Sequence, residues 1–409
     1  MSLLDKASLI VTPNSYKASK LYSVIPSSGA GDMDVVRATT ATRVNASGLI
    51  ESVGLNIPRI DYTNGSCPSL LVEPQRTNLA LYSEQFDNAI WVKQLSTISA
   101  NATTSPSGIV NADKYIPTNA NGFHPVNQSI SVTNGASYSF SIYAKAAGYN
   151  FLLINTSAGS ASGNVGPLFD LSNGTLIGSL GGNNYNAKIK AVGDNWYRID
   201  FSYITSGILT LVDINAFPTS AIASYAGNGT SGVYLWGAQL ELGAYATSYI
   251  PTVASTVTRN ADVISKTGIS SLIGQTEGTL FCDVNLNSRA NFTYFAIAPN
   301  IVSTSTYIGI FVTSSIIGFE IIISGVVQVG INFSNSSTGR FKIAAAYKNN
   351  DFAFYINGNL IGIDTLGNIP ACSDLGLNAF SQAQTLNYNS VQLYKTRLTN
   401  TELQSLTTL

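Results

Sequence analysis

The side chains best suited to chemistry are few and widely spaced in this chain. Its 409 residues include one histidine and three cysteines. His124 is therefore the only possible histidine base for a Ser-His-Asp or Cys-His mechanism, and no G-x-S-x-G motif accompanies it. Three isolated cysteines and one histidine also fall short of the usual tetrahedral zinc sets. We expect no such catalysis, no bound metal and no cofactor.

Paired carboxylates are the other catalytic device to consider, because glycosidases place two of them a few ångströms apart. The chain has 22 acidic residues. Those that fall in expected strands or turns of its middle part are Asp170, Asp194, Asp200, Asp213 and Glu241. Their spacing in the sequence does not single out two of them as the catalytic acid and the nucleophile of a glycosidase. The sequence therefore predicts a protein that is not an enzyme.

A polar turn at Asn349, Asn350 and Asp351 offers oxygen atoms of the kind that bind calcium. No D-x-[DN]-x-[DN]-G loop is present. A solvated turn is the preferred interpretation, and calcium binding remains the alternative.

Aromatic side chains in polar loops are the best candidates for ligand binding. A sugar is bound by aromatic faces against its apolar side and by polar groups at its hydroxyls. The predicted glycan-binding residues are Phe123 and His124 in NANGFHPVN, Tyr185 in GGNNYNA and Tyr225 in IASYAGNGT. Trp196 and Trp236 lie within strand-like patterns instead, so we expect them to pack in a core.

Charge and hydropathy exclude several partners. The 21 basic and 22 acidic residues give a net charge of −1, which argues against nucleic-acid binding. The N-terminus lacks the pattern of a secretory signal, and no apolar run reaches the roughly 18 residues of a membrane span. We expect no membrane insertion.

Cys67, Cys282 and Cys372 are predicted to be unpaired thiols, with a Cys282–Cys372 bridge as the alternative.

Apolar side chains alternate with polar ones along much of the chain, which predicts β-strands. The candidate residues named above are therefore expected to lie on strands or on the turns between them. In SYSFSIYAK, residues 137–145, every second residue from Tyr138 to Ala144 is apolar, which predicts a strand with one face buried. Asn-Gly pairs at 134–135 and 173–174 predict tight turns. Residues 79–255 are therefore predicted to form an antiparallel β-sandwich of jelly-roll type.

A second all-β series follows a Ser- and Thr-rich linker at residues 256–274. In DFAFYINGNLIGI, Asn357-Gly358 predicts a hairpin turn. Thr399 and Glu402 form a capping box that predicts a short C-terminal helix. Residues 275–409 resemble the concanavalin-like and laminin-G-like lectin sandwiches. Residues 1–78 are interrupted by Pro and Gly and are predicted to be a separate docking and oligomerisation segment.

Two stretches resemble one domain of known proteins. These are LLVEPQRTNLALYSEQFDNAIW at residues 70–91 and YLWGAQLELGAYATSYIPT at 234–252, the latter followed by TRNAD at 258–262. They are similar to the opening and closing segments of a carbohydrate-binding-module-like sandwich in bacteriophage tail and head-fibre proteins. The resemblance implies an all-β virion spike or fibre protein, made in the bacterial cytoplasm, that attaches to host surface glycans.

The same resemblance implies the partners. We expect a homo-oligomer, most simply a trimer, that docks on other virion proteins through residues 1–78 and binds a host cell-surface glycan. One alternative is a decoration or tail-structural protein that binds only virion proteins. A lesser alternative is a spike that cleaves polysaccharide.

Overall fold

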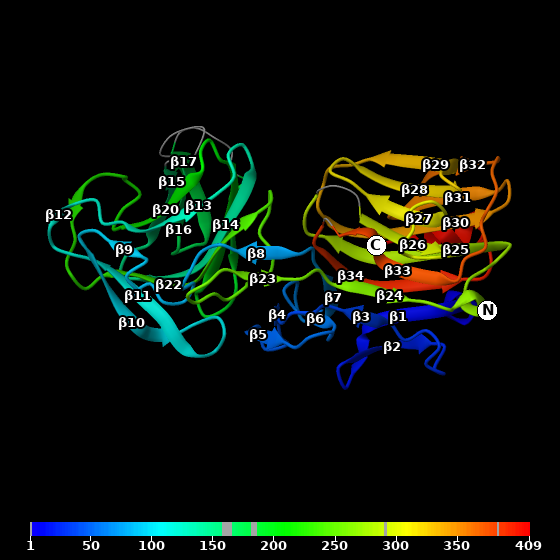
Figure 1. The fold of residues 1–409 in the computed structure, drawn as a ribbon, viewed down its shortest axis with the longest axis horizontal. Helices are drawn as coiled ribbons and strands as arrows, with labels where there is room; N and C mark the ends of the chain where they lie inside the picture. Colours follow the sequence, from blue (N-terminus) through cyan, green and yellow to red (C-terminus); the bar gives the residue numbers. More distant parts are fainter. Residues whose placement is uncertain (1, 158–165, 181–185, 290–292, 383) are drawn as a thin grey trace. The chain divides into compact units, whose positions relative to one another are not determined.

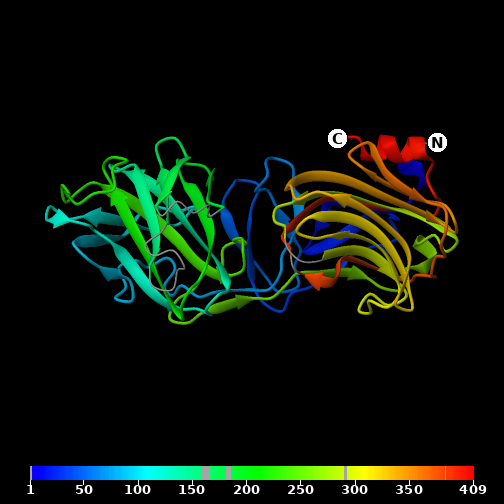
Figure 2. The same ribbon diagram turned by 90° about the horizontal axis from the view of Figure 1, so that it is seen from above.

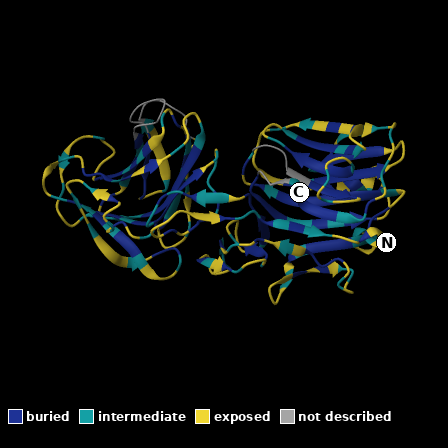
Figure 3. Ribbon diagram, in the orientation of Figure 1, coloured by how far each residue is buried: buried dark blue, intermediate teal, exposed yellow. Residues whose placement is uncertain are grey.

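The computed structural model describes residues 2–157, 166–180, 186–289, 293–382 and 384–409 (Figure 1). It is an all-β protein built from antiparallel sheets, as the alternation predicted. The chain forms two compact units. The first comprises Met1–Ala46, Ser52–Gln75 and Asn260–Leu409, and the second comprises Ser47–Glu51 and Arg76–Arg259. In both, buried residues fill the space between sheets while the turns are exposed (Figure 3).

The first unit contains two sheets. The β25 sheet runs in the order β2 (Lys20–Ile25), β1 (Ala7–Lys17), β34 (Leu386–Tyr394), β25 (Glu277–Leu286), β30 (Gly339–Lys348), β31 (Phe352–Ile356), β32 (Asn359–Asp364), with β7 (Ser69–Val72) on β34 and β6 (Arg59–Asp61) on β7. The β27 sheet runs in the order β29 (Val326–Ser334), β28 (Ile316–Ile323), β27 (Tyr307–Val312), β26 (Thr293–Ala298), β33 (Asp374–Gln382), β24 (Val263–Lys266), β3 (Asp34–Val36). Side chains such as Leu280 and Phe319 form one core between them.

The second unit also contains two sheets. The β14 sheet runs in the order β10 (Ser96–Thr104), β11 (Val110–Pro117), β22 (Gly232–Leu242), β14 (Ser137–Ala147), β19 (Tyr197–Ile204), β18 (Lys188–Ala191). The β15 sheet runs in the order β17 (Thr175–Leu180), β16 (Gly166–Asp170), β15 (Phe151–Ser157), β20 (Leu209–Phe217), β13 (Val126–Ser131), β9 (Val92–Lys93). Phe140 and Ile214 represent the shared core.

Three pairs of short strands complete the architecture. They are β4 (Ala41–Val44) with β5 (Ile50–Val53), β8 (Arg76–Asn78) with β23 (Val257–Arg259), and β12 (Asn121–Gly122) with β21 (Tyr225–Ala226).

The predicted boundary at residue 78 differs from this architecture. β1 and β7 both pair with β34, and Val11 lies opposite Val391. Leu9 and Leu70 are buried in the core of the first unit. Residues 1–75 therefore complete a sheet of the C-terminal sandwich, because their own strands bury too little surface alone. The predicted linker at 256–274 likewise contains β23 and β24.

Several local predictions are confirmed. Asn357 and Gly358 have φ values of 49° and 79°, as a tight hairpin turn requires. The predicted helix is α2 (Asn400–Thr407), capped by Thr399 and Glu402. Trp196 and Trp236 are each 2% exposed. The three cysteines are free thiols, so the alternative Cys282–Cys372 bridge does not form.

The predicted half-buried strand at residues 137–145 is buried on both faces. Tyr138 and Phe140 face the core, and Tyr143 on the opposite parity is 4% exposed. The chain after β22 covers this second face, where Gln239 Oε1 accepts a hydrogen bond from the Ile250 backbone at 2.6 Å. The first part of the stretch YLWGAQLELGAYATSYIPT therefore belongs to strand β22, and the part around Ile250 packs against that strand.

Four buried charged residues form a cluster in the first unit. Two of them, Glu73 and Asp262, belong to the stretches at residues 70–91 and 258–262. Asp262 forms ion pairs with Arg37, at 2.8 Å, and with Arg59. Arg59 also pairs with Glu73 at 2.7 Å. Although burial opposes its charge, Asp262 and Glu73 raise the pKa of Arg59. Burial lowers the pKa of Arg37, which Asp262 counteracts. These residues tie distant segments of the unit together.

Helix α2 packs on the β25 sheet through Leu403, beside the short helix α1 (Leu3–Lys6) and the N-terminus (Figure 2). Lys6 of α1 pairs with Glu402 of α2. Hydrogen bonds from Lys6 and from the Thr399 backbone lower the pKa of Glu402 to about 2. This ion pair joins the two ends of the described chain.

We predict a small, pH-dependent effect for Glu402→Gln, which keeps the cap but removes the charge. Because the folded pKa of Glu402 is depressed, the pair stabilises the fold above the unfolded value, about 4.3, and this stabilisation is lost as the pH falls toward 2. The variant should lose at most about 1 kcal/mol at pH 7, since the pair is partly exposed. Thermal melts at pH 7 and pH 3 test this, and an equal loss at both values would contradict it.

Candidate glycan-binding face of the second unit

Three of the four predicted ligand-binding residues lie together in the second unit. Pairing of β12 with β21 places Gly122 opposite Tyr225. The ring centroids of His124 and Tyr225 are 4.6 Å apart, and Phe217 at the end of β20 lies 5.8 Å from Tyr225 and 6.4 Å from Phe123. Phe123, Phe217 and Tyr225, together with Phe151, are called the aromatic wall below, although Phe217 itself is only 1% exposed and packs in a small core with Leu153 and Leu168. Tyr185 lies outside the described residues.

The members of this group differ in exposure. Phe123 is 47% exposed, so a ligand can reach its ring. Tyr225 is half-buried, its hydroxyl donates to the Ala216 carbonyl at 2.6 Å, and burial raises its pKa. His124 is only 1% exposed. Direct contact between its ring and a glycan is therefore a wrong prediction for His124.

His124 instead ties two loops to each other. Its Nδ1 lies 2.5 Å from the Leu95 carbonyl, and its Nε2 lies 3.0 Å from the Tyr225 carbonyl. The Tyr115 hydroxyl, itself buried, donates to the backbone carbonyl of His124. The histidine thus fixes the backbone next to the exposed Phe123.

A row of polar side chains crosses the outer face of the β15 sheet beside the aromatic wall. Asn127 on β13, Asp213 on β20 and Asn155 on β15 are register partners. Val212 and Ile214, the neighbours of Asp213, point into the core, so Asp213 points outward because side chains alternate along a strand. Asn215, two residues further, donates to Asp213 Oδ2 at 3.2 Å. We call these four residues the polar row.

The polar row holds a carboxylate that three amide side chains surround. Burial raises the pKa of Asp213, the side chains of Asn215, Asn127 and Asn155 lower it, and neither Lys nor Arg contributes. Asp213 Oδ1 and Asn155 Oδ1 are buried, and neither has a hydrogen-bond partner in the described part of the chain. Both atoms lie below the surface, where an ordered water molecule is the usual donor to an acceptor that protein groups leave unpaired.

Sequence reasoning missed the polar row, although a signal was present. In LTLVDINAF, residues 209–217, Asp213, Asn215 and Phe217 share the parity opposite to the core residues. That pattern places a carboxylate, an amide and an aromatic ring on one face. Their cross-strand partners Asn127 and Asn155 could not be found this way, because pairing between distant strands leaves no local pattern.

Of the four other carboxylates that the sequence singled out, each has partners of its own, and Asp200 and Glu241 interact electrostatically. Asp170 accepts from the Ser172 backbone at 2.8 Å, and Glu241 accepts from that of Thr247 at 2.9 Å. Asp194 pairs with Lys145 at 3.0 Å. Burial raises the pKa of Asp200, while Arg198 and Lys188 lower it.

The predicted alternative of a calcium turn gains no support from the first unit. Asn349 Oδ1 and Asn350 Oδ1 accept backbone hydrogen bonds, at 3.0 and 3.1 Å, and Asp351 pairs with Arg397. Across the described residues no group of three or more His, Cys, Asp or Glu could hold a metal. In that same part of the chain, every helix is too short or too polar to cross a bilayer.

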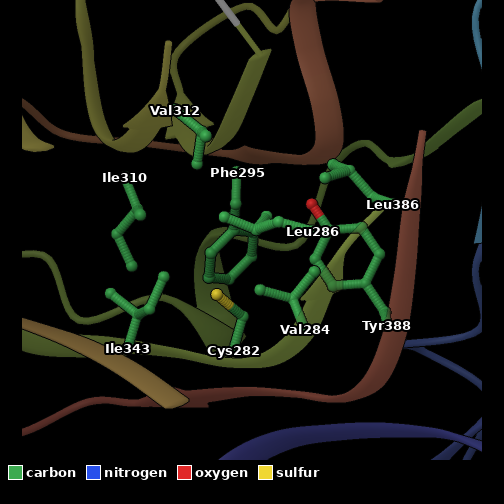
Figure 4. A pocket seen from close by; sticks show the side chains of 9 residues that line it. All are labelled: Cys282, Val284, Leu286, Phe295, Ile310, Val312, Ile343, Leu386 and Tyr388. Atoms are coloured by element: carbon green, nitrogen blue, oxygen red, sulfur yellow. The ribbon is translucent and has the colours of Figure 1, made fainter. Parts of the chain in front are cut away.

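A small cavity in the core of the first unit is not a sugar site. Its lining is apolar except for the Cys282 thiol and the Tyr388 hydroxyl (Figure 4). The Tyr388 hydroxyl donates to the Leu377 carbonyl, and burial raises the pKa of Cys282. The volume of about 10 Å³ admits at most one water molecule. The surface of the β15 sheet remains the better candidate.

Comparison with known proteins gives matches of fold only. No protein-family model matches the chain, and no curated protein matches it significantly. Among solved structures it is similar to the CBM40 module of Ruminococcus gnavus IT-sialidase bound to α2,3-sialyllactose, at 14% identity over 34% of this chain and 86% of that one, with a TM-score of 0.30.

Two further solved structures are similar over about a third of the chain. One is of botulinum neurotoxin type C, whose cell entry depends on interaction with two ganglioside molecules; identity is 13% over 36% of this chain and 40% of that one, with a TM-score of 0.31. The other is the heptameric SAP-like pentraxin of Limulus polyphemus, at 11% identity over 32% and 69%, with a TM-score of 0.26. These values give no basis for assigning a ligand.

Proposed function

We propose that this chain is a noncatalytic attachment protein on the surface of a bacteriophage particle, and that the outer face of the β15 sheet binds a host glycan. The observation that carries the glycan site is the exposed Phe123 ring, which packs edge-on against Phe217 at one end of the sheet face that also carries the polar row. Aromatic rings cover the apolar side of a sugar, and amides and carboxylates bind its hydroxyls.

The virion location rests on the two stretches that resemble phage fibre proteins. In this proposal the chain is a homo-oligomer, most simply a trimer, and residues 1–78 dock on other virion proteins. Because those residues supply β1, β2, β6 and β7 of the β25 sheet, deleting them should unfold the first unit. Docking is better tested by a point change at an exposed residue. Val36→Asp, at 57% exposure, should lower incorporation into particles if this segment docks, and normal incorporation of a set of such variants would contradict docking.

Phe123→Ala tests the attachment function. Loss of one stacking ring should weaken glycan binding about 2- to 10-fold per site, and several copies on one particle should amplify the loss in adsorption. Because Phe123 is half exposed, the melting temperature should change little. Ile109→Ala, at 63% exposure, is a control of similar exposure that should adsorb normally.

The outcomes separate the alternatives. A normal rate of adsorption for Phe123→Ala particles, with no glycan bound by the purified protein, would favour a purely structural role in the virion. Shortening of a bound polysaccharide would favour a cleaving spike. Unfolding of the variant would show that Phe123 is a packing residue.

A further inference from the structure

We infer that the second unit has a further ligand site on the outer face of the β14 sheet, where Lys114, Tyr234 and Lys145 bind a sugar that carries a negatively charged group. This site lies on the other sheet from the polar row, and it goes beyond the function proposed above.

The cations of the second unit are concentrated on this sheet. The strands of the β14 sheet carry five lysine and arginine residues, which are Lys114, Lys145, Lys188, Lys190 and Arg198. Each is next in the chain to a residue that packs in or against the core, so all five side chains point outward because side chains alternate along a strand. Of the described strands, those of the β15 sheet carry only Lys93. The β14 sheet is therefore the face that attracts anions.

The carboxylates of this face lie away from the proposed site or are occupied. Asp200 on β19 is paired in register with Ser141 on β14, and four residues of β14, about 13 Å, separate Ser141 from Lys145. Glu241 is 0% exposed, so a ligand cannot reach it. Glu84 accepts hydrogen bonds from two side chains of the unit at 3.0 and 2.8 Å.

Tyr234 lies between the two lysines on three neighbouring strands. The register pairs Tyr234 on β22 with Lys114 on β11 and with Lys145 on β14. Because neighbouring strands are about 4.8 Å apart, the backbones of the two lysines lie about 10 Å apart, one on each side of the tyrosine. The Lys114 ammonium group lies 5.8 Å from the centre of the Tyr234 ring. A sugar that stacks on this ring therefore has an ammonium group beside its substituents.

All three side chains reach the surface. Each residue is partly exposed, and the side chain of Lys145 is 19% exposed. Within the described residues Lys114 forms no ion pair, so no carboxylate of the chain neutralises its charge there. Lys145 pairs at 3.0 Å with Asp194, whose side chain is 73% exposed. Such an exposed pair is weak, and a ligand anion can share the Lys145 ammonium group.

The chemistry of these groups selects an anionic sugar. A lysine ammonium group has three donors and no acceptor, and its hydrogen bonds to carboxylate or phosphate oxygens are stronger than those to hydroxyls. The tyrosine ring offers a stacking surface to the apolar side of the sugar. A nucleic acid would require many phosphate contacts, whereas this site has two lysines on a chain of net charge −1.

The test compares charged and uncharged forms of one sugar on the full chain, by titration calorimetry at low ionic strength. Trigalacturonate should bind, and its methyl ester should bind at least about tenfold more weakly, because esterification removes the charged acceptors. Binding of glucose 6-phosphate, with glucose as its control, would identify phosphate as the charged group. Added salt should weaken the binding of either anion, because the lysines are exposed to solvent.

Substitutions with opposite expected signs locate the site. Lys114→Gln and Tyr234→Ala should each lose about five- to tenfold affinity for the anionic sugar, while Lys114→Arg should retain it. Asp194→Asn, which removes the partner of Lys145, should raise the affinity about two- to threefold, a gain that damage to the fold would not produce. Lys188→Gln, which removes a charge from the edge strand of the same sheet, is the matched control and should change affinity less than about twofold.

The failures are distinguishable. Equal affinity for the charged and uncharged sugars, or binding of none of the four, would overturn the anionic site, and so would equal losses for Lys188→Gln and Lys114→Gln. Tighter binding of single-stranded DNA than of either anionic sugar would overturn the assignment to a sugar. Phe123→Ala should bind the anionic sugar as the wild type does. Failure of this site therefore leaves the function proposed for the β15 sheet to its own adsorption test.

Discussion

Replacing Asp262 with alanine is expected to lower the free energy of unfolding of the first unit by about 3–5 kcal/mol, because it leaves buried arginines without their shared carboxylate. Asp262 is 1% exposed and pairs with both Arg37 and Arg59, which are fully buried at their side chains. Its Oδ2 also accepts from the Glu73 backbone at 3.0 Å. Glu73 alone would then have to balance both guanidinium groups.

Urea denaturation followed by far-ultraviolet circular dichroism measures this loss, and hydrogen exchange locates it in β6, β7 and β24. The matched control is Asp34→Ala, which removes an exposed carboxylate 3.3 Å from Lys266. An exposed pair of this kind contributes at most about 1 kcal/mol. Equal effects of the two substitutions would show that the buried charges do not hold the unit together.

Asn78→Ala is expected to destabilise the second unit by about 3–5 kcal/mol. Asn78 is fully buried, and its amide donates to the carbonyls of Ala238 and Ile250 at 3.1 and 2.8 Å. Its oxygen accepts from the backbones of Ala80 and Leu240 at 3.0 and 3.1 Å. The variant leaves four buried backbone groups without these partners, and each such loss costs about 1–3 kcal/mol unless water enters.

Tryptophan fluorescence reports this change directly, since Trp91, Trp196 and Trp236 all belong to the second unit. Asn228→Ala is a control with a similar number of hydrogen bonds, made in an exposed turn to Thr230 and Ser231. Water can replace those bonds, so its loss should stay below about 1 kcal/mol. If Asn78→Ala also lowered the free energy of unfolding by less than about 1 kcal/mol, the surrounding backbone groups would have found other hydrogen-bond partners.

Asp262 and Asn78, whose substitutions are expected to destabilise the two units, both lie in the two stretches singled out in the sequence. Glu73, Asn78 and Asp262 lie in or at the ends of those stretches, and all three are buried polar residues with several partners. The stretches therefore contribute buried polar groups that join distant segments within each unit. The glycan-binding residues proposed for the outer face of the β15 sheet lie elsewhere in the chain.

The sequence by itself determined the features that depend on neighbouring residues. Alternation predicted the strands, Asn357-Gly358 predicted a hairpin turn, and Thr399 with Glu402 predicted the cap of α2. These features are readable because the interacting groups lie within a few positions of one another. Phe123 and Tyr225 were also predicted as ligand-binding residues from their polar loops, and that role stays a prediction.

Only the tertiary structure decided which distant segments meet. It paired Val11 with Val391, so that the predicted separate head became part of a sheet. It buried His124 between two backbone carbonyls, and it placed Asp213 between Asn127 and Asn155. The register of distant strands follows from the packing of the whole core, because no local sequence pattern encodes which strand lies opposite another. The polar row exists only once that register is set.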